Sequence, residues 1–266
     1  IVNAFKGMVL GAILVVLSIA LLWWNEGRSV KQYKSLKEGQ GAVVSASATP
    51  IDKTLEGSLV YITGLATSSS ELTDSEFGIN ERLIKLDRDV EIYQWKETER
   101  TKTEKNLGGS ETKVKSYSYS KGWADGLIDS RKFKKSTEHE NPTVMKYNKY
   151  SRVADSVTLG DYSLSTALKY RFKTQLYPNL KDVLNHDSVP KEATINEQYL
   201  YIGKNEADPQ IGDIKITWSF AKDTDASVVA KQQDTKLIGY QTKAGNKIEI
   251  LREGNIGVNQ IFEDAL

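Results

Sequence analysis

The stretch Gly7–Trp24, GMVLGAILVVLSIALLWW, decides how the rest of the chain is organised, and it contains no charged residue. At ~1.5 Å rise per residue it spans roughly 27 Å as a helix, close to the ~30 Å hydrocarbon core of a bilayer. A helix also satisfies its backbone hydrogen bonds internally, which lipid requires. The alternatives are a buried core helix and a cleaved signal peptide, but no small-residue cleavage site follows the run. The stretch therefore predicts a membrane anchor.

The residues that end this stretch are typical of the lipid head-group layer. Trp23 and Trp24 each combine an apolar ring with a polar N–H, which suits that layer. Asn25, Glu26 and Arg28 follow them, and we expect these residues to fix the helix exit. The long side chain of Arg28 is expected to extend toward lipid phosphates.

The other end of the stretch carries a small-residue motif. Gly7 and Gly11 are four residues apart, with Ala12 beside them, so they lie on one face of a helix. Such glycines allow two helices to approach closely in lipid, although a chance occurrence is the plain alternative. We predict Gly7 and Gly11 as helix-contact residues.

Composition excludes several classes of function. The chain has 266 residues with 36 Lys and Arg against 35 Asp and Glu, so no net field attracts nucleic acid. It has no cysteine, which excludes disulfides and thiolate metal sites. Its two histidines, His139 and His186, leave little for zinc or triad chemistry, and His139 is expected to be exposed in a loop. We therefore expect no enzyme, no metal and no cofactor.

The remainder reads as an α+β, strand-dominated domain with long antiparallel hairpins, preceded by the single N-terminal transmembrane helix. We assign residues 1–27 to the anchor and 28–266 to the domain, with a short membrane-proximal helix at about 28–39 that Gly39 and Gly41 stop. Alternating patterns predict further strands at the following ranges: 42–46, 59–67, 198–203, 213–221, 236–242 and 247–252. Helical spacing predicts helices at 163–173, 179–185 and 256–266.

The clearest strand is 82–99, followed by a second alternating run at 111–123. Between them lies the turn sequence Asn106–Ser110, so the pair predicts a long antiparallel hairpin. Its aromatic residues are expected to form a cross-strand ladder and an interaction surface. These residues are Tyr93, Trp95, Tyr117, Tyr119 and Trp123.

Two basic segments interleave with aromatic residues, RKFKK at 131–135 and KYNKYSR at 146–152. Such segments can bind phosphates of lipid or nucleic acid, but a solvated strand or helix face is the favoured interpretation. The balanced overall charge favours the solvated surface. The only Asn-x-Ser/Thr sequence, at Asn141–Thr143, contains proline and is no glycosylation acceptor, which is compatible with a bacterial origin.

Several stretches together resemble the LUMA family of transmembrane proteins. They occur in the family's order along most of the chain. The stretches are LLWWNEGR (21–28), DVEIYQWKE (89–97), KSYSYSKGW (115–123), ENP (140–142), GDIKITWSF (212–220), SVVAKQ (227–232) and LIGYQTKAGNKIEIL (237–251).

The resemblance implies a bacterial-type homologue with a large extracytoplasmic domain, which is lumenal in eukaryotic members. Family members in animals lie in the endoplasmic reticulum and inner nuclear membrane, self-associate and contact nuclear-envelope proteins, and no enzymatic activity is established for them. The family also has membrane helices near its C-terminus, which the sequence up to Leu266 does not include.

The flanking charges oppose this orientation. Lys6 precedes the anchor, whereas four cations follow it (Arg28, Lys31, Lys34 and Lys37), which alone would place the domain in the cytoplasm. Long domains cross largely regardless of such charges, so we predict an extracytoplasmic domain, periplasmic in bacteria.

We therefore predict a non-enzymatic membrane-anchored scaffold that homo-oligomerises and organises a membrane domain. Its expected partners are the lipid bilayer, further copies of itself and other membrane proteins, but not nucleic acid. The alternative is a membrane-tethered ligand- or lipid-binding module, in which the anchor is only a tether.

Overall fold

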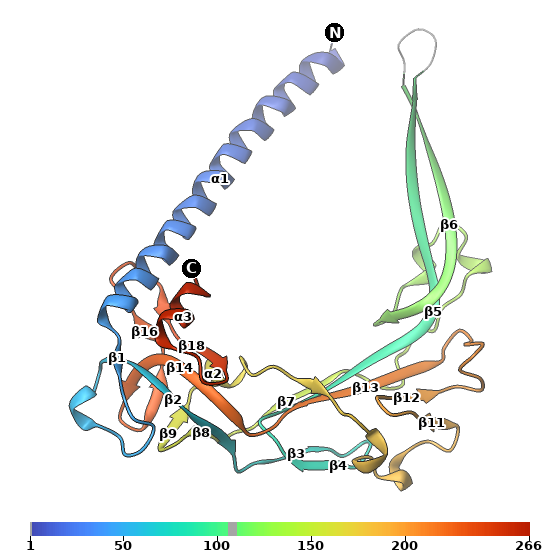
Figure 1. Ribbon diagram of the computed structural model, residues 1–266. Helices are drawn as coiled ribbons and strands as arrows, with labels where there is room; N and C mark the ends of the chain where they lie inside the picture. The colour runs from blue at the N-terminus through green and yellow to red at the C-terminus, as the bar shows by residue number, and fades with distance from the viewer. Residues whose placement is uncertain (1, 106–110) are drawn as a thin grey trace. The chain divides into compact units, whose positions relative to one another are not determined.

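The computed structural model describes residues 2–105 and 111–266, and it begins with one long helix, α1 (Val2–Ala42) (Figure 1). Its apolar part has a mean hydropathy of 2.4 over an 18-residue window with no residue buried. The predicted separate helix at 28–39 is instead a continuation of α1. No proline interrupts the segment, and a helix tolerates Gly27 at a cost of only ~1 kcal/mol.

The chain divides into two compact units. Unit 1 comprises residues 1–68, 155–172 and 223–266, and unit 2 comprises residues 69–154 and 173–222. Strands account for 41% of the chain and helices for 24%, so the predicted strand-dominated α+β class with an N-terminal apolar helix is confirmed.

Unit 1 is built on one sheet whose order is β1-β2-β8-β9-β15-β14-β18. Because β2 also pairs with β14, the strands from β2 to β14 form a closed ring. The bounds of these strands are β1 (Val44–Ser45), β2 (Leu59–Ser68), β8 (Val157–Leu159), β9 (Tyr162–Leu164), β14 (Thr224–Gln233), β15 (Lys236–Ile238) and β18 (Ile250–Glu253). The small elements are η1 (Lys53–Leu55), α2 (Thr166–Lys169), the β16 (Tyr240–Gln241) and β17 (Lys247–Ile248) hairpin, and α3 (Val258–Glu263).

A hydrophobic cluster joins α1 to this sheet. Leu36 of α1 packs with Ile248, Ile250, Ile261 and Phe262, each of them buried. The last two belong to α3, which confirms the predicted C-terminal helix. The anchor is therefore fixed to unit 1 by apolar contact at its C-terminal end.

Unit 2 is built on a second sheet, of order β11-β12-β13-β5-β6, with β10 added to β13 and β7 added to β5. Its strands are β3 (Glu71–Asp74), β4 (Ile79–Arg82), β5 (Lys85–Lys105), β6 (Glu111–Asp125), β7 (Tyr150–Val153), β10 (Gln175–Leu176), β11 (Ala193–Ile195), β12 (Tyr199–Ile202) and β13 (Ile214–Ala221). Its short 3-10 turns are η2 (Ser130–Lys132), η3 (Ser136–Glu138), η4 (Leu180–Asp182) and η5 (His186–Ser188).

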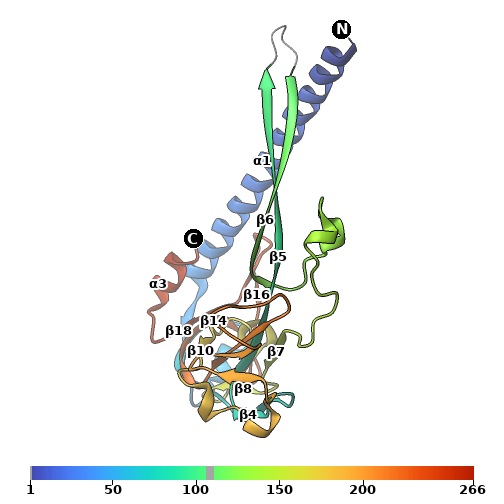
Figure 2. The same ribbon diagram turned by 90° about the vertical axis from the view of Figure 1, so that its right-hand side faces the viewer.

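The predicted long hairpin is β5 paired with β6, in register from Glu91–Asp125 to Lys105–Glu111. Pairing of β5 with β13 ends at Ile92, so the outer part of the hairpin is a two-stranded ribbon that twists beyond the sheet (Figure 2). The predicted turn at 106–110 lies outside the described residues.

Two predicted helices are wrong. In the range 163–173, Leu164 pairs with β15 as part of β9, and only the single turn α2 follows. In the range 179–185 only the 3-10 turn η4 forms, with Asn179 as its cap. Segments this short do not form stable helices on spacing alone, so tertiary pairing decides their conformation.

Candidate functional site

The predicted membrane-interface residues lie together on α1. Trp23 and Trp24 are 80% and 72% exposed, and Asn25, Glu26 and Arg28 are also exposed. From Gly7 to Lys34, every residue whose side chain is described is exposed. Its part from Gly7 to Trp24 is an exposed apolar helix with an aromatic end, as is typical of a segment that a bilayer solvates.

The predicted helix-contact residues are equally open. Among the described residues, a methyl group added at Gly7 or Gly11 would meet nothing within 4 Å apart from the adjoining backbone of α1. Their face of α1 is therefore available for close approach by a second helix.

The five predicted aromatic residues lie on one face of the β5–β6 hairpin, named here the aromatic face: Tyr93, Trp95, Tyr117, Tyr119 and Trp123. Only one pair is directly opposed, Tyr93 and Trp123, whose ring centroids are 5.3 Å apart. The other rings face charged partners across the strands. Lys121 lies over Trp95 at 4.9 Å, and the Tyr119 hydroxyl donates to Glu97 over 2.6 Å. The face is thus a mixture of aromatic and ionic pairs instead of a continuous ladder.

His139 covers part of the aromatic face. Its ring stacks on Tyr119 with centroids 3.7 Å apart and meets the edge of Trp95 at 4.6 Å. It is therefore half-buried, and the expectation of an exposed loop histidine is wrong. Burial, with the hydrogen bond to Glu97, raises the pKa of Tyr119 above its ordinary value.

Asn141 holds this covering loop in place. Its Oδ1 accepts from the backbone N–H of Trp95 over 2.7 Å, and its Nδ2 donates to the Trp95 carbonyl over 2.9 Å. The side chain thereby continues the strand pairing of β5 where β13 has ended. The sequence signal was the ENP motif at 140–142, but nothing in the motif itself indicates this contact.

The most buried charges form a closed cluster in unit 2. Arg88 donates to both carboxylate oxygens of Asp74 at 3.0 Å and contacts Glu76 at 2.6 Å. Trp218 Nε1 also donates to Asp74, over 2.9 Å. Across the described residues, every buried side-chain nitrogen or oxygen has a hydrogen-bond partner, and no group of three His, Asp or Glu residues is placed to hold a metal ion. The hydrogen-bonding groups of the cluster are thus satisfied by one another.

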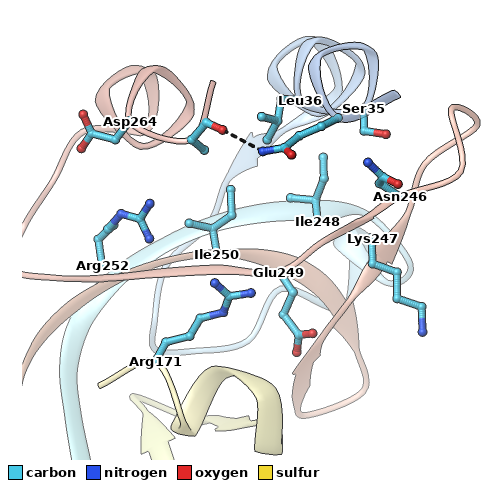
Figure 3. A pocket seen from close by; sticks show the side chains of 12 residues that line it. Ser35, Leu36, Arg171, Asn246, Lys247, Ile248, Glu249, Ile250, Arg252 and Asp264 are labelled. Carbon is cyan, nitrogen blue, oxygen red and sulfur yellow. Dashed lines mark hydrogen bonds between the residues drawn. The ribbon is translucent and has the colours of Figure 1, made fainter. Parts of the chain in front are cut away.

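Sequence reasoning missed one cavity, named here the junction pocket, at the place where α1 meets the sheet of unit 1 (Figure 3). It has a volume of about 520 Å³. Its lining comes from four parts of the chain: α1, the segment after α2, the stretch that contains β17 and β18, and the residues that follow α3. The lining residues are Gln32, Ser35, Leu36, Arg171, Asn246, Lys247, Ile248, Glu249, Ile250, Arg252, Asp264 and Ala265. Since these segments are far apart in sequence, no local pattern could have assembled them.

Comparison with known proteins identifies the family. The profile of the family described as Transmembrane protein 43 matches residues 92–266. This chain belongs to the Transmembrane protein 43 (LUMA) family. The family resemblance read from the sequence is therefore confirmed, and α1 is the candidate membrane span of a transmembrane-protein family.

Individual relatives match almost the whole chain. Transmembrane protein 43 of Mus musculus is 32% identical over 270 residues, 96% of this chain and 66% of its own length. The Homo sapiens protein is 31% identical over 98% of this chain, and the Drosophila melanogaster homolog is 30% identical over 95%. The chain thus spans about two-thirds of the length of these Transmembrane protein 43 relatives. No solved structure matches it.

Proposed function

We propose that this chain is a non-enzymatic, membrane-anchored scaffold whose copies associate and organise a patch of bilayer. The observation that carries the proposal is the open face of α1. Gly7 and Gly11 lie in an exposed apolar helix, where no described part of the chain outside the adjoining helix backbone comes within 4 Å of a Cβ placed on them. Small-xxx-small faces bring helices together in lipid. The partners proposed are the lipid bilayer, further copies and other membrane proteins, but not nucleic acid.

The outer ribbon of the β5–β6 hairpin supports the same proposal. Residues 98–104 and 111–116 are exposed on both strands. A two-stranded ribbon has unpaired backbone groups along both edges, and such edges pair readily with another chain. Association of copies would give both the outer part of the β5–β6 hairpin and the exposed part of α1 packing partners.

The test is the oligomeric state of the intact protein in neutral detergent and in lipid nanodiscs, measured by mass photometry. We expect oligomers that a Gly7→Leu/Gly11→Leu variant reduces. The matched control is Val9→Leu/Val16→Leu, which enlarges side chains on the opposite face of α1. A monomer at every concentration tried, or equal effects of both variants, would overturn the proposal.

We further propose that the large domain is extracytoplasmic. The chain has no cysteine, so a single cysteine introduced at the exposed Ser118 can be labelled without background. A membrane-impermeant maleimide applied to intact cells or sealed vesicles should label it only from the extracytoplasmic side. Labelling from the cytoplasmic side would reverse the assignment.

The alternative function, a membrane-tethered lipid-binding module, is favoured by one specific observation, the basic lining of the junction pocket.

A further inference from the structure

The junction pocket lies where the anchor enters unit 1. Leu36 of α1 forms part of its floor with Ile248 and Ile250, and all three are buried in the cluster that fixes α1 to the sheet. Gln32 of α1 donates to the carbonyl of Ala265 over 3.4 Å, across the rim of the pocket. A volume of about 520 Å³ is within the ~300–1,000 Å³ of small-molecule sites.

Within the described residues, the cations of the pocket form no ion pair with another side chain. The side chains of Arg171 and Lys247 make no hydrogen bond or ion pair with any residue in the described ranges, and Arg252 donates only to the adjacent carbonyl of Leu251 over 3.2 Å. Figure 3 shows both guanidinium groups directed toward the centre of the pocket. Two guanidinium groups that face one concavity create a site for an anion, because each offers a planar fork of donors.

In the described part of the chain, neither carboxylate of the lining forms an ion pair with these cations. Glu249 accepts a hydrogen bond from Ser165, and Asp264 accepts from Gln260 over 2.7 Å. In Figure 3 the Asp264 carboxylate points away from both arginines. Both guanidinium groups are therefore free to donate to an anion that enters the pocket.

The pocket lies close to the membrane surface. Gln32 follows Trp24 by eight residues, which is ~12 Å along the helix axis. The head-group layer is ~5–8 Å thick on each side, and charges at its surface act over a Debye length of ~8–10 Å. A head group that projects beyond the average lipid therefore reaches the rim of the pocket, and the exposed Arg28 and Lys31 add positive charge along the way.

We propose that the junction pocket binds the phosphomonoester of an anionic phospholipid with an extended head group. Arg171 and Arg252 donate to the phosphate oxygens, and Lys247 contributes a third positive charge. A phosphomonoester carries up to two charges and three acceptor oxygens, so it satisfies both guanidinium groups at once. This assignment is independent of whether copies of the chain associate.

The experiment uses the intact chain in neutral detergent, with bound molecules counted by native mass spectrometry. The probes are a short-chain monophosphorylated phosphatidylinositol, short-chain phosphatidylglycerol and phosphatidylcholine, the water-soluble inositol phosphate of the first head group, and inorganic phosphate. We expect the monophosphorylated lipid to bind about tenfold more tightly than phosphatidylglycerol, since it alone combines an exposed phosphomonoester with an anchor.

The variants are Arg171→Gln/Arg252→Gln and the charge reversal Arg171→Glu, both expected to weaken this binding about tenfold or more. Arg171 is exposed and its side chain has no partner among the residues that the structure describes, so we expect its replacement to leave the fold intact. The matched control Arg100→Gln/Arg131→Gln removes the same charge from exposed sites in unit 2 and should bind as the wild type does. Equal loss in both double variants, or no lipid preference in the wild type, would overturn the proposal. Equal binding of the water-soluble inositol phosphate and the lipid would overturn the lipid assignment.

Discussion

Removal of the Asp74 carboxylate should destabilise unit 2 far more than removal of the neighbouring Glu76 carboxylate. Both groups contact the same guanidinium, that of Arg88. They differ in burial, because Asp74 is 2% exposed and Glu76 is 43% exposed. The pair Asp74→Ala and Glu76→Ala therefore separates the effect of burial from the effect of charge.

The magnitude follows from the bonds each carboxylate makes. Asp74 accepts two hydrogen bonds from Arg88 and one from Trp218, so Asp74→Ala leaves a buried guanidinium short of partners and a buried indole N–H without its acceptor. Breaking a buried pair costs ~3–5 kcal/mol, and an orphaned donor adds ~1–3 kcal/mol. Arg88 keeps Glu76 and the carbonyl of Asn148, which places the total near ~4–5 kcal/mol. An exposed partner such as Glu76 contributes ~1 kcal/mol or less.

The assay is thermal unfolding of the intact chain in neutral detergent, followed by tryptophan fluorescence. The expected difference in free energy lowers the Tm by roughly 10–15 °C for Asp74→Ala and by roughly 2–4 °C for Glu76→Ala. The double variant Asp74→Leu/Arg88→Met should recover much of the loss, since two apolar groups replace both buried charges. Equal shifts for the two alanine variants would refute the reasoning, as would no recovery in the double variant.

Three further predictions test other parts of the structure. A Cβ at Gly39 would overlap core side chains, whereas one at Gly41 meets open space. In the same thermal unfolding assay, Gly39→Ala should therefore lower the free energy of unfolding by ~1–3 kcal/mol, and Gly41→Ala should leave it unchanged or raise it by up to ~1 kcal/mol. Similar Tm shifts for the two variants would contradict this. Asn141→Ala should speed amide exchange at Trp95 roughly 10- to 100-fold, measured by hydrogen–deuterium exchange, because it removes the acceptor of that N–H and a donor to that carbonyl; unchanged exchange would contradict this. Burial raises the pKa of Tyr177 above its ordinary value of 10.0, so the stability it contributes is present below about pH 10 and is lost as the pH rises. Between about pH 10 and 12 the wild type should thus lose more stability than Tyr177→Phe, and parallel pH profiles would be inconsistent with a buried hydroxyl.

The sequence correctly predicted the elements whose conformation depends only on neighbouring residues, namely α1 and the β5–β6 hairpin. The uncharged run Gly7–Trp24 predicted a helix, and the alternating runs around 106–110 predicted the β5–β6 hairpin. Neither needs information from elsewhere in the chain, because period and length alone distinguish them. The short segment 163–173 failed for the converse reason: Leu164 belongs to a strand only because β15 lies beside it.

The candidate sites likewise divide into those that neighbouring residues define and those that depend on contacts between distant parts of the chain. Trp23 and Trp24 are found from the end of an apolar run, and both are exposed on α1; their place at the membrane interface stays a prediction. The stacking of His139 on Tyr119 could not be predicted from the sequence, because it depends on hydrogen bonds between the Asn141 side chain and the backbone of Trp95 in β5. The junction pocket was beyond prediction altogether, since four separate parts of the chain supply its lining.

The sequence singled out Gly39 as a special position, but it suggested the wrong reason. Its position two residues before Gly41 suggested a helix stop, yet α1 continues through both glycines to Ala42. Gly39 is buried, and a Cβ there would lie 3.2 Å from Phe262 of α3 and overlap Ile248 of β17. The glycine is needed because the helix backbone packs directly on the core of unit 1.

The packing of Leu36 and Gly39 against unit 1 fixes α1 to the sheet. A helix of 41 residues is ~60 Å long, about twice the hydrocarbon thickness, so its second half extends beyond the lipid as a continuous rod. A rod fixed to the sheet through Leu36 and Gly39 cannot swivel at the membrane surface in the way that a glycine-rich linker would. The height of the junction pocket above Trp24 is therefore set by the helix, and any head group that binds there must reach a fixed distance.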